Sequence, residues 1–425
     1  MPARVLRFLH AANLRLDAPL APTGVGPIDD SLRQLLDEAT VEAFSRIVSI
    51  AIEQDADALI LTGNSFDAGA GSLSADVALQ RELRRLNHVG LPVFITPGIS
   101  DPAAAWREIP SLPENVTLYL QGNEEGIDLT DRGRKLATIL PVCAQTGVDP
   151  QELENILATA SLSAERREFT IGMWIPRSGD FEAPKSAGFS SLNYLAAGAS
   201  ALSSQLPLTE GQIHVQEGPQ GLHAGETGWR GCQLVDVDSE GAMVRRLIPV
   251  APVRWETCVV NSQKVSDRDE LCELMLGHLE LLTGYAGEQL RIITCRIDQQ
   301  SLESAGVFTE RDLAELQCSL VELSDQPKKG LRYLHRVEPM WDDEYVPSSV
   351  DRELWQDFHA QADRWSRLEL EQLTRLWEQH HGSETVPNGW PAELRWPPID
   401  AERVRRRAIA NGRRWFSETK GGAAR

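Results

Sequence analysis

Four short segments place polar or small side chains directly after predicted strands, which is where α/β sheets carry their chemistry. They read FLHAANLRLDAPL (8–20), LTGNSFDAG (61–69), ITPGISDP (95–102) and YLAAGASA (194–201). Strand ends of this kind can hold two divalent cations that clamp a phosphate, provided that acidic and imidazole side chains occupy them. The chemistry open to this chain therefore depends on which residues fill these positions.

The frame of these segments resembles the metallophosphoesterase (calcineurin-like) superfamily, and within it the branch of SbcD-like and YhaO-like DNA-repair exonucleases. The corresponding family signatures are D-x-H, G-D-x-F-D, G-N-H-D and G-H-x-H, and the segment IGMWIPRSG (171–179) resembles the family strand that ends in a ligand histidine. The most specific match is EGPQGLHAGETGWRGCQLVDVD (217–238) with the following PVAPVRW (249–255), which is close to the end of the catalytic domain in YhaO-like proteins. The resemblance covers residues 4–258 well and the next domain loosely. It implies a site for two Mn or similar divalent ions.

Other residues stand at every ligand position that the resemblance implies. These positions are Asn13 and Arg15 for D-x-H, Asn64 for the bridging aspartate, Ile99 and Ser100 for the asparagine ligand and the general-acid histidine, Ile175 for the later histidine, and Ala199 and Ala201 for G-H-x-H. Isoleucine and alanine have no donor atoms, asparagine is a weak neutral ligand, and arginine places a fixed cation where a dication should lie. We therefore predict no metal cofactor and no catalytic residue in this frame.

Two aspartates and one histidine near these positions have structural interpretations. In the family, aspartates at the positions of Asp67 and Asp101 support the loops, and a remnant Mg²⁺ site is the alternative. His10 lies inside a predicted strand, so we predict a buried histidine with satisfied hydrogen bonds. Only His10 and His88 occur in the first two hundred residues, so a shifted set of histidine ligands cannot form there. The G-P-Q-G and G-E-T-G turns lack the strand-to-helix context of a P-loop and are predicted to shape loops.

The composition limits the class of protein. A net charge of −20 argues against non-specific nucleic-acid binding over the whole surface. Residues 401–425 hold eight basic and two acidic residues, a local charge of +6, which leaves −26 for the rest of the chain. No apolar run is long enough to span a membrane, and the N-terminus lacks the features of a signal peptide. Six scattered cysteines without a C-x-x-C pair indicate reduced thiols and a cytoplasmic protein, with Cys232 a buried apolar side chain.

The periodicity predicts alternating strands and helices over the first two hundred residues. Strands are predicted at 5–12, 57–63, 93–98, 116–120, 135–142 and 169–175, with helices at 31–54 and 73–87. The resemblance then implies a four-layer α/β/β/α metallophosphoesterase sandwich over residues 1–253. Residues 254–339 read as a small α+β capping-like domain, with a helix near 267–282 and a strand at 290–297. Residues 340–425 form a helical, Trp-rich and basic-ended C-terminal region.

The C-terminal region is the candidate surface for a partner or for nucleic acid. It holds seven of the eleven tryptophans, and Trp355, Trp365 and Trp377 fall on one predicted helix. Packing against the body of the protein is one interpretation, and docking of a partner is the other, because tryptophan and arginine dominate interface hot spots. The basic tail carries Arg405, Arg406, Arg407, Arg413 and Arg414, which are candidates for contact with DNA phosphates, a solvated helix being the alternative. The resemblance implies an SMC-like ATPase as partner and allows a dimer.

Two hypotheses about function follow. The first is a pseudoenzyme, a catalytically inactive relative of DNA-repair exonucleases that serves as a scaffold or as a subunit that binds DNA or a partner. The second is an active metal-dependent exonuclease or phosphodiesterase that takes its ligands from elsewhere. Because all the implied ligands are replaced, the first hypothesis is the one we carry forward.

Overall fold

The computed structural model describes residues 4–22, 25, 28–120, 126–143, 169–175, 192–198, 209–210, 213–261, 265–298, 301–302, 305–307, 310–324 and 331–340. Its contacts divide the chain into two units. One unit comprises Met1–Cys258, His278–Thr294 and Val321–Arg336, and the other comprises Val259–Gly277, Cys295–Leu320 and Val337–Arg425. The domain boundaries expected from the sequence stay predictions, and the Trp-rich C-terminal region lies outside the described residues.

The first sheet carries the N-terminal strands. Its order is β12-β11-β1-β2-β3-β4. The strands are β1 (Arg4–Ala12), β2 (Ala58–Thr62), β3 (Val93–Thr96), β4 (Val116–Leu118), β11 (Gly231–Asp238) and β12 (Met243–Pro249). Strands β1 to β4 are parallel to one another, whereas β11 is antiparallel to β1 and to β12. The ends of β1, β2 and β3 therefore meet at the same edge of the sheet.

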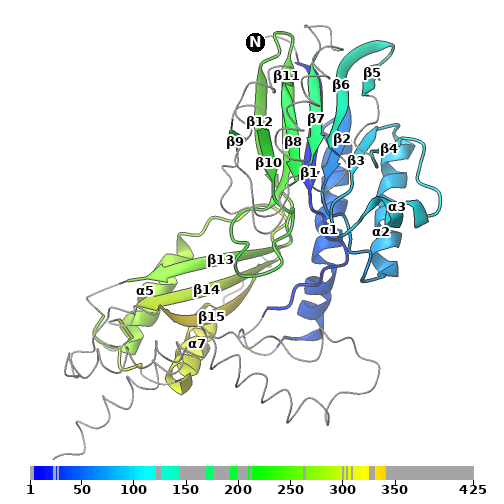
Figure 1. The fold of residues 1–425 in the computed structure, drawn as a ribbon. Helices are drawn as coiled ribbons and strands as arrows, with labels where there is room; N and C mark the ends of the chain where they lie inside the picture. The colour runs from blue at the N-terminus through cyan, green and yellow to red at the C-terminus, as the bar shows by residue number, and fades with distance from the viewer. Residues whose placement is uncertain are drawn as a thin grey trace, which may run out of the picture. The chain divides into compact units, whose positions relative to one another are not determined.

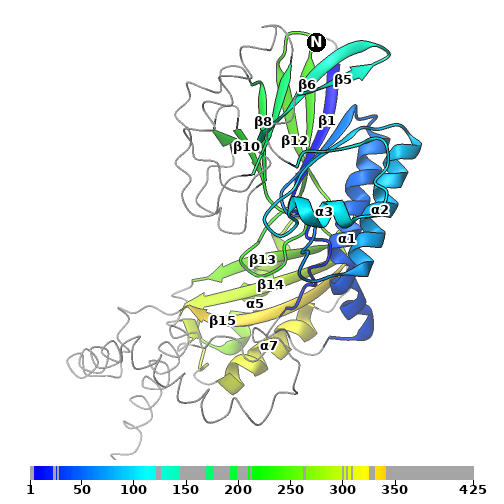
Figure 2. The same cartoon turned by 45° about the vertical axis from the view of Figure 1, so that its right-hand side comes forward.

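Helices cover one face of this sheet. Figures 1 and 2 both show α1 (Asp30–Glu53) and α2 (Leu73–His88) side by side, and α3 (Ala103–Glu108) follows β3. The Asp29 side chain caps α1 by accepting a hydrogen bond from the Leu32 N–H at 2.7 Å. Apolar residues of the two helices, such as Phe44 and Leu83, pack on Leu9 and Leu61 of the strands. The wide apolar face of residues 30–53 is thus buried against the first sheet.

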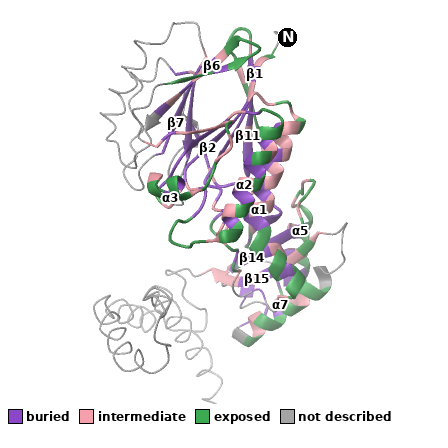
Figure 3. Cartoon of the chain, turned by 90° about the vertical axis from the view of Figure 1, so that its right-hand side faces the viewer, coloured by how far each residue is buried: buried purple, intermediate pink, exposed green. Residues whose placement is uncertain are grey.

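A second sheet packs against the opposite face of the first. Its order is β5-β6-β7-β8-β10-β9. The strands are β5 (Ile127–Asp131), β6 (Arg134–Cys143), β7 (Thr170–Trp174), β8 (Tyr194–Gly198), β9 (Thr209–Glu210) and β10 (Ile213–Gln216). The core between the sheets includes Phe8, Ile60, Ile139 and Met173. Figure 3 shows these central strands as buried and the outer faces of the helices as exposed.

The α/β sandwich expected from the sequence is therefore correct. The described residues form a helix layer and two sheets, so the second helix layer of the predicted four stays a prediction. Predicted strand and helix bounds agree with the structure to within about two residues. Strands β5, β9, β10 and β12 and helix α3 were not predicted. No helix in the described residues is long and apolar enough to span a membrane.

A third sheet follows, with the order β13-β14-β15. Its elements are β13 (Val253–Val260), α5 (Arg268–Glu280), β14 (Leu290–Asp298), α7 (Glu310–Ser324) and β15 (Arg332–Met340), in line with the predicted small α+β region. In the first unit, the buried Glu288 carboxylate bridges two buried arginines, with Oε1 at 3.0 Å from Arg254 Nε and at 2.8 Å from Arg291 Nε. In the second unit, Arg268 on α5 pairs with Glu315 on α7 at 2.9 Å.

Candidate functional site

The loops after β1, β2 and β3 meet through two asparagine side chains at the implied metal positions. Asn13 Oδ1 accepts a hydrogen bond from the Asn64 N–H at 3.1 Å, and Asn64 Oδ1 accepts one from the Ser100 N–H at 2.9 Å. The Asn13 N–H in turn donates to the carbonyl of Thr62 at 3.0 Å. The structure therefore brings Asn13, Asn64 and Ser100 together, and both amide oxygens are engaged by backbone donors.

Two glycines let these asparagines approach so closely. A Cβ atom on Gly63 would lie 2.4 Å from Asn13 Oδ1, and one on Gly98 would lie 2.2 Å from Asn64 Oδ1. Asn13 itself has a φ of 50°, a left-handed conformation that asparagine adopts more readily than most residues. Gly63 and Gly98 match glycines of the motifs that the chain resembles. Because neither has a side chain, Asn13 and Asn64 can fill the space between the loops.

Arg15 forms the strongest interaction at these positions. Its Nη1 and Nη2 atoms donate to Oε1 and Oε2 of Glu226, each at 2.9 Å, and Nη2 also lies 3.3 Å from the carbonyl of Gln220. Both side chains are mostly buried, with 20% of Arg15 and 10% of Glu226 exposed. Burial alone would raise the pKa of Glu226, but the Arg15 guanidinium, together with the Leu222 N–H and the charge of Arg230, holds the pKa below its usual value. The Glu226 carboxylate is therefore ionised, and both of its oxygens accept hydrogen bonds from Arg15.

Glu226 is the residue at this site that sequence reasoning missed. It belongs to the G-E-T-G turn, 211 residues from Arg15. Its Oε2 atom also accepts a hydrogen bond from the Leu222 N–H at 2.8 Å, so the carboxylate shapes its own loop. The available signal was the match of residues 217–238 to the family, which marked the segment as significant without naming a partner for Arg15.

Of the remaining implied positions, the structure describes Ile99 and Ile175. Ile99 has 55% of its surface exposed, whereas Ile175 is buried at the end of β7. Ala199 and Ala201 lie outside the described residues, as do Trp355, Trp365, Trp377, Arg405, Arg406, Arg407, Arg413 and Arg414. Within the described residues, no group of three or more His, Cys, Asp or Glu side chains is placed to hold a metal ion. A guanidinium and two engaged amides do not suit a pair of dications.

Asp101 is a buried support for the loops. Its Oδ1 atom accepts a hydrogen bond from the Gly98 N–H at 2.6 Å, and Oδ2 accepts from the Ser65 N–H and from Trp106 Nε1, each at 3.0 Å. Burial raises the pKa of Asp101 to about 7, although these donors oppose the shift. Asp67 accepts a hydrogen bond from the Gly69 N–H at 2.8 Å within its own turn. These contacts agree with the structural role expected for both aspartates.

His10 is fully buried and has a partner on each ring nitrogen. Nδ1 lies 3.0 Å from the Tyr194 hydroxyl, and Nε2 lies 3.0 Å from Thr62 Oγ1. Burial lowers the pKa of His10 to about 3, with a smaller contribution from His214, so the ring is neutral. Cys232 is also fully buried, and burial raises the pKa of its thiol to about 12. Both side chains are thus buried in their uncharged forms, which agrees with the structural interpretation of His10 and Cys232 from the sequence.

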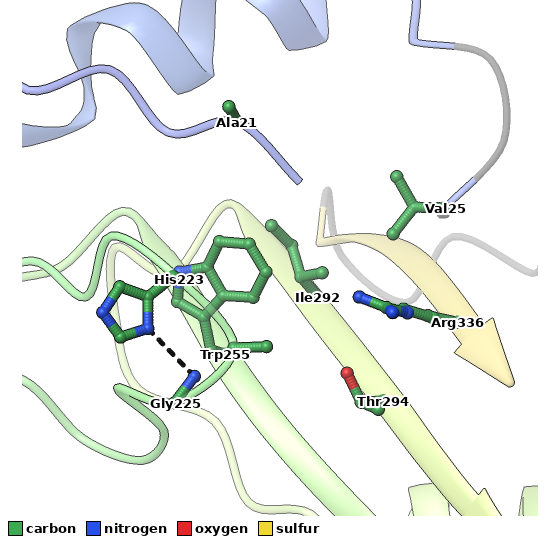
Figure 4. A pocket seen from close by; sticks show the side chains of 9 residues that line it. Ala21, Val25, His223, Gly225, Trp255, Ile292, Thr294 and Arg336 are labelled. Atoms are coloured by element: carbon green, nitrogen blue, oxygen red, sulfur yellow. Dashed lines mark hydrogen bonds between the residues drawn. The ribbon is translucent and has the colours of Figure 1, made fainter. Parts of the chain in front are cut away.

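A pocket of about 260 Å³ lies beside the loop that holds Glu226. Figure 4 shows Trp255, Ile292 and Thr294 on the third sheet, with Arg336 beside them and Ala21 and Val25 across the opening. The loop side is the turn at His223, whose Nδ1 accepts a hydrogen bond from the Gly225 N–H at 3.1 Å. The lining combines apolar surface with one arginine and one exposed histidine. It offers a binding surface, and the catalytic groups of a hydrolase are not among these residues.

Comparison with known proteins relates the chain to one curated protein. Over 135 residues it is 29% identical to the uncharacterized metallophosphoesterase YhaO of Bacillus subtilis (strain 168), a match that spans 32% of this chain and 32% of that protein. The matched part is thus about a third of the relative's length. No family model matches the chain.

A solved structure, that of TT1561 of Thermus thermophilus, is also similar. It shows 13% identity and a TM-score of 0.33, over 57% of this chain and 98% of that one. The match to YhaO and the ordered strand ends agree with the resemblance found in the motifs. Over those 135 residues the chain is thus similar to a protein described as a metallophosphoesterase, and other residues stand at the positions that the motif resemblance implies for the metal ligands.

Proposed function

We propose that the chain is a pseudoenzyme of the metallophosphoesterase family, a non-catalytic relative of DNA-repair exonucleases that serves as a scaffold or as a subunit that binds a partner or DNA. The observation that carries this proposal is the ion pair between Arg15 and Glu226. Arg15 stands where the resemblance implies a histidine ligand, and the Glu226 carboxylate neutralises its charge, so this position holds an ion pair between two side chains of the protein.

The residues at the substituted positions link the loops to one another through hydrogen bonds and an ion pair. Asn13 and Asn64 hydrogen bond the loops to each other, and Arg15 joins the loop after β1 to the loop at Glu226. A metal site ties strand ends together through its ligands, and these contacts tie the same strand ends together without a cation. A chain selected for this arrangement keeps the scaffold while it gives up the cations on which phosphoester hydrolysis in the family depends.

The proposed partners rest on sequence and resemblance. The tryptophans and arginines of residues 340–425 provide the residue types that dominate interface hot spots and phosphate contacts. The family resemblance adds an SMC-like ATPase as the partner class. Within this proposal the sandwich is the platform, the C-terminal region is the contact surface, and DNA binding is confined to the basic tail because the rest of the chain is strongly acidic.

The test of inactivity measures metal and turnover on the same purified sample. The full chain is incubated with Mn²⁺, separated from free ion and measured for bound metal. It is then assayed on bis(p-nitrophenyl) phosphate and on single- and double-stranded DNA with Mn²⁺ present. We expect well below one equivalent of metal and no hydrolysis above the blank.

The matched variants are Asn64→Ala and Asn87→Ala, the second being an exposed asparagine of α2. One or more equivalents of metal, together with turnover that Asn64→Ala abolishes and Asn87→Ala leaves intact, would overturn the proposal. That result would favour an active phosphodiesterase with an unorthodox site.

A further inference from the structure

A second and larger pocket adjoins the substituted metal positions, because Gly218 in its lining approaches Arg15 and Asn13 so closely that an added Cβ would lie 2.6 Å from Arg15 Nη2 and 3.0 Å from the Asn13 carbonyl. It has a volume of about 590 Å³ and is lined by residues of β8, β10, β11 and β12 and of the segment between β10 and β11. Pockets that bind small molecules commonly have volumes of about 300 to 1,000 Å³. Their walls are mostly apolar and carry a few polar groups. The polar groups of the lining include His214, Arg230 and Arg245, with Tyr194, Gln216, Glu217 and Gln233.

The hydrogen bonding of His214 fixes its tautomer. Arg245 Nη1 lies 2.6 Å from His214 Nδ1. A guanidinium has no acceptor and keeps its protons, so it must be the donor and Nδ1 the acceptor. The ring is therefore neutral with its proton on Nε2. Consistent with this, burial and the nearby Arg245 lower the pKa of His214 to about 4.

Two buried N–H donors on this pocket's lining residues have no acceptor among the residues that the structure describes. His214 is 4% exposed, and its Nε2 atom has no hydrogen-bond partner among the described residues. Arg230 is 8% exposed, and its Nη1 pairs with Glu217 at 2.8 Å while its Nε has no partner in the same part of the chain. Buried donors without partners are uncommon, and each needs an explanation. A ligand rich in hydrogen-bond acceptors would satisfy both donors, because His214 and Arg230 line the same pocket.

The charge and the rim of the pocket narrow the class of ligand. Two guanidinium groups, Arg230 and Arg245, stand against one carboxylate, Glu217, so the lining has an excess of positive charge. Guanidinium binds carboxylate and phosphate groups through paired N–H donors. The apolar part of the lining includes Trp229 and Leu247, which are 46% and 43% exposed. A ligand with one anionic end and one planar apolar end would satisfy both parts.

We propose that this pocket binds a small organic anion, a phosphate or carboxylate that carries a planar apolar group. The anionic group lies at Arg245 and Arg230, and the planar group lies against Trp229 and Leu247. The proposal concerns binding alone, so it does not depend on whether the chain hydrolyses phosphoesters.

Four related probes separate the parts of the proposal by isothermal titration calorimetry on the full chain. Adenosine 5′-monophosphate and adenosine-5′-carboxylic acid share a planar base and differ in the anion. Adenosine lacks the anion, and inorganic phosphate lacks the base. We expect at least one of the two adenosine anions to bind, and the tighter of the two identifies the anionic group. Adenosine and inorganic phosphate should each bind at least about tenfold more weakly, since a hydrogen-bonded charge contributes at least that much.

The variants Arg245→Gln and Arg246→Gln form a matched pair. Both remove one positive charge from β12, but Arg245 lines the pocket while Arg246 pairs with Asp236 at 3.4 Å. Arg245→Gln should weaken binding about tenfold or more, and Arg246→Gln should change it by less than about twofold. Circular dichroism and thermal unfolding check that both variants fold.

Several outcomes overturn the proposal. If neither adenosine anion binds at millimolar concentration, the site does not exist for this ligand class. Equal weakening in Arg245→Gln and Arg246→Gln would reduce the effect to general surface charge. Adenosine binding as tightly as its anions would remove the role of the arginines, and inorganic phosphate binding as tightly would remove the role of the apolar rim. Should Arg245→Gln fail to fold, Leu247→Glu tests the apolar rim with the same probes, and unchanged affinity there counts against the site.

Discussion

Arg15 and Glu226, 211 residues apart in the chain, form a two-point ion pair in which both N–O distances are 2.9 Å. The guanidinium follows the end of β1, and the carboxylate sits in the turn before β11. A pair this well aligned and largely removed from water makes each partner depend on the other, because either side chain alone would be a poorly solvated charge.

The first prediction concerns the stability that this pair confers. Glu226→Gln should destabilise the fold by about 2–4 kcal/mol, because it leaves the Arg15 charge without its carboxylate. Unfolding in urea, followed by tryptophan fluorescence, measures the change. Arg84→Met is the control, since Arg84 is exposed on α2 and its guanidinium donates to the Gln80 side chain at 2.7 Å. A loss below about 0.5 kcal/mol in Glu226→Gln, the size expected for a surface substitution, would contradict the assignment.

The second prediction concerns the response to acid. His10 has its pKa lowered to about 3 in the folded state, against an unfolded value of 6.5. Between these values the unfolded chain binds a proton that the folded chain does not, so stability falls as the pH falls from 6.5 towards 3. The contribution of one such residue is a slope of about 1.4 kcal/mol per pH unit.

The variant His10→Gln keeps a polar side chain and removes this titration. Its free energy of unfolding should depend less steeply on pH between 4 and 6 than that of the unchanged chain, by about one proton. Urea unfolding at several pH values measures the slope. His88→Gln is the control, because His88 is exposed at the end of α2. Parallel pH profiles for the unchanged chain and His10→Gln would show that His10 titrates normally in the folded state.

The sequence was informative where a local pattern decides the outcome. The apolar spacing predicts a helix at 31–54, one residue from the observed bounds of α1 at each end, and the strand-end segments predict where the loops meet. The buried role of His10 followed from its place inside β1. In each case the relevant forces act between residues that are near in sequence or share one strand.

Contacts between distant segments were not predictable in the same way. Nothing near Arg15 in sequence identifies Glu226, and nothing near Arg245 identifies His214, because these pairs depend on how the sheets pack. Strand β12 was missed since MVRRLIP lacks a strict alternation, being an edge strand with a mostly exposed surface. The motifs located the substituted ligand positions, but only the structure located the contacts that the substituting residues make.

The third prediction tests the close approach of the loops after β2 and β3. A methyl group on Gly98 would lie 2.2 Å from Asn64 Oδ1 and 2.6 Å from the Asn64 backbone nitrogen. Because the backbone cannot move aside cheaply, Gly98→Ala should destabilise the fold by about 2 kcal/mol or more. Gly277→Ala is the control, since Gly277 lies in α5 with no atom within 4 Å of the added carbon, and alanine there should be neutral or stabilising. Thermal unfolding of both variants measures the effect. Equal melting temperatures would contradict the close packing of Gly98 against Asn64.

The last prediction concerns metal and stability together. A ligand that binds the folded state stabilises it in proportion to the logarithm of its concentration over Kd, so a resident divalent pair would make unfolding sensitive to chelation. Asn13, Arg15 and Asn64 engage other protein groups in place of cations. We therefore expect Mn²⁺ at millimolar concentration and an excess of EDTA to give the same melting temperature within about 1 °C at constant ionic strength.

Mg²⁺ is the matched control for the non-specific effect of a dication on an acidic chain. Stabilisation by Mn²⁺ that Mg²⁺ does not reproduce, and that EDTA reverses, would place a metal in the folded protein and count against an inactive scaffold. Loss of that effect in Asn64→Ala would place the metal at the loops after β1 and β2, whereas its persistence would direct the search to a site elsewhere in the chain.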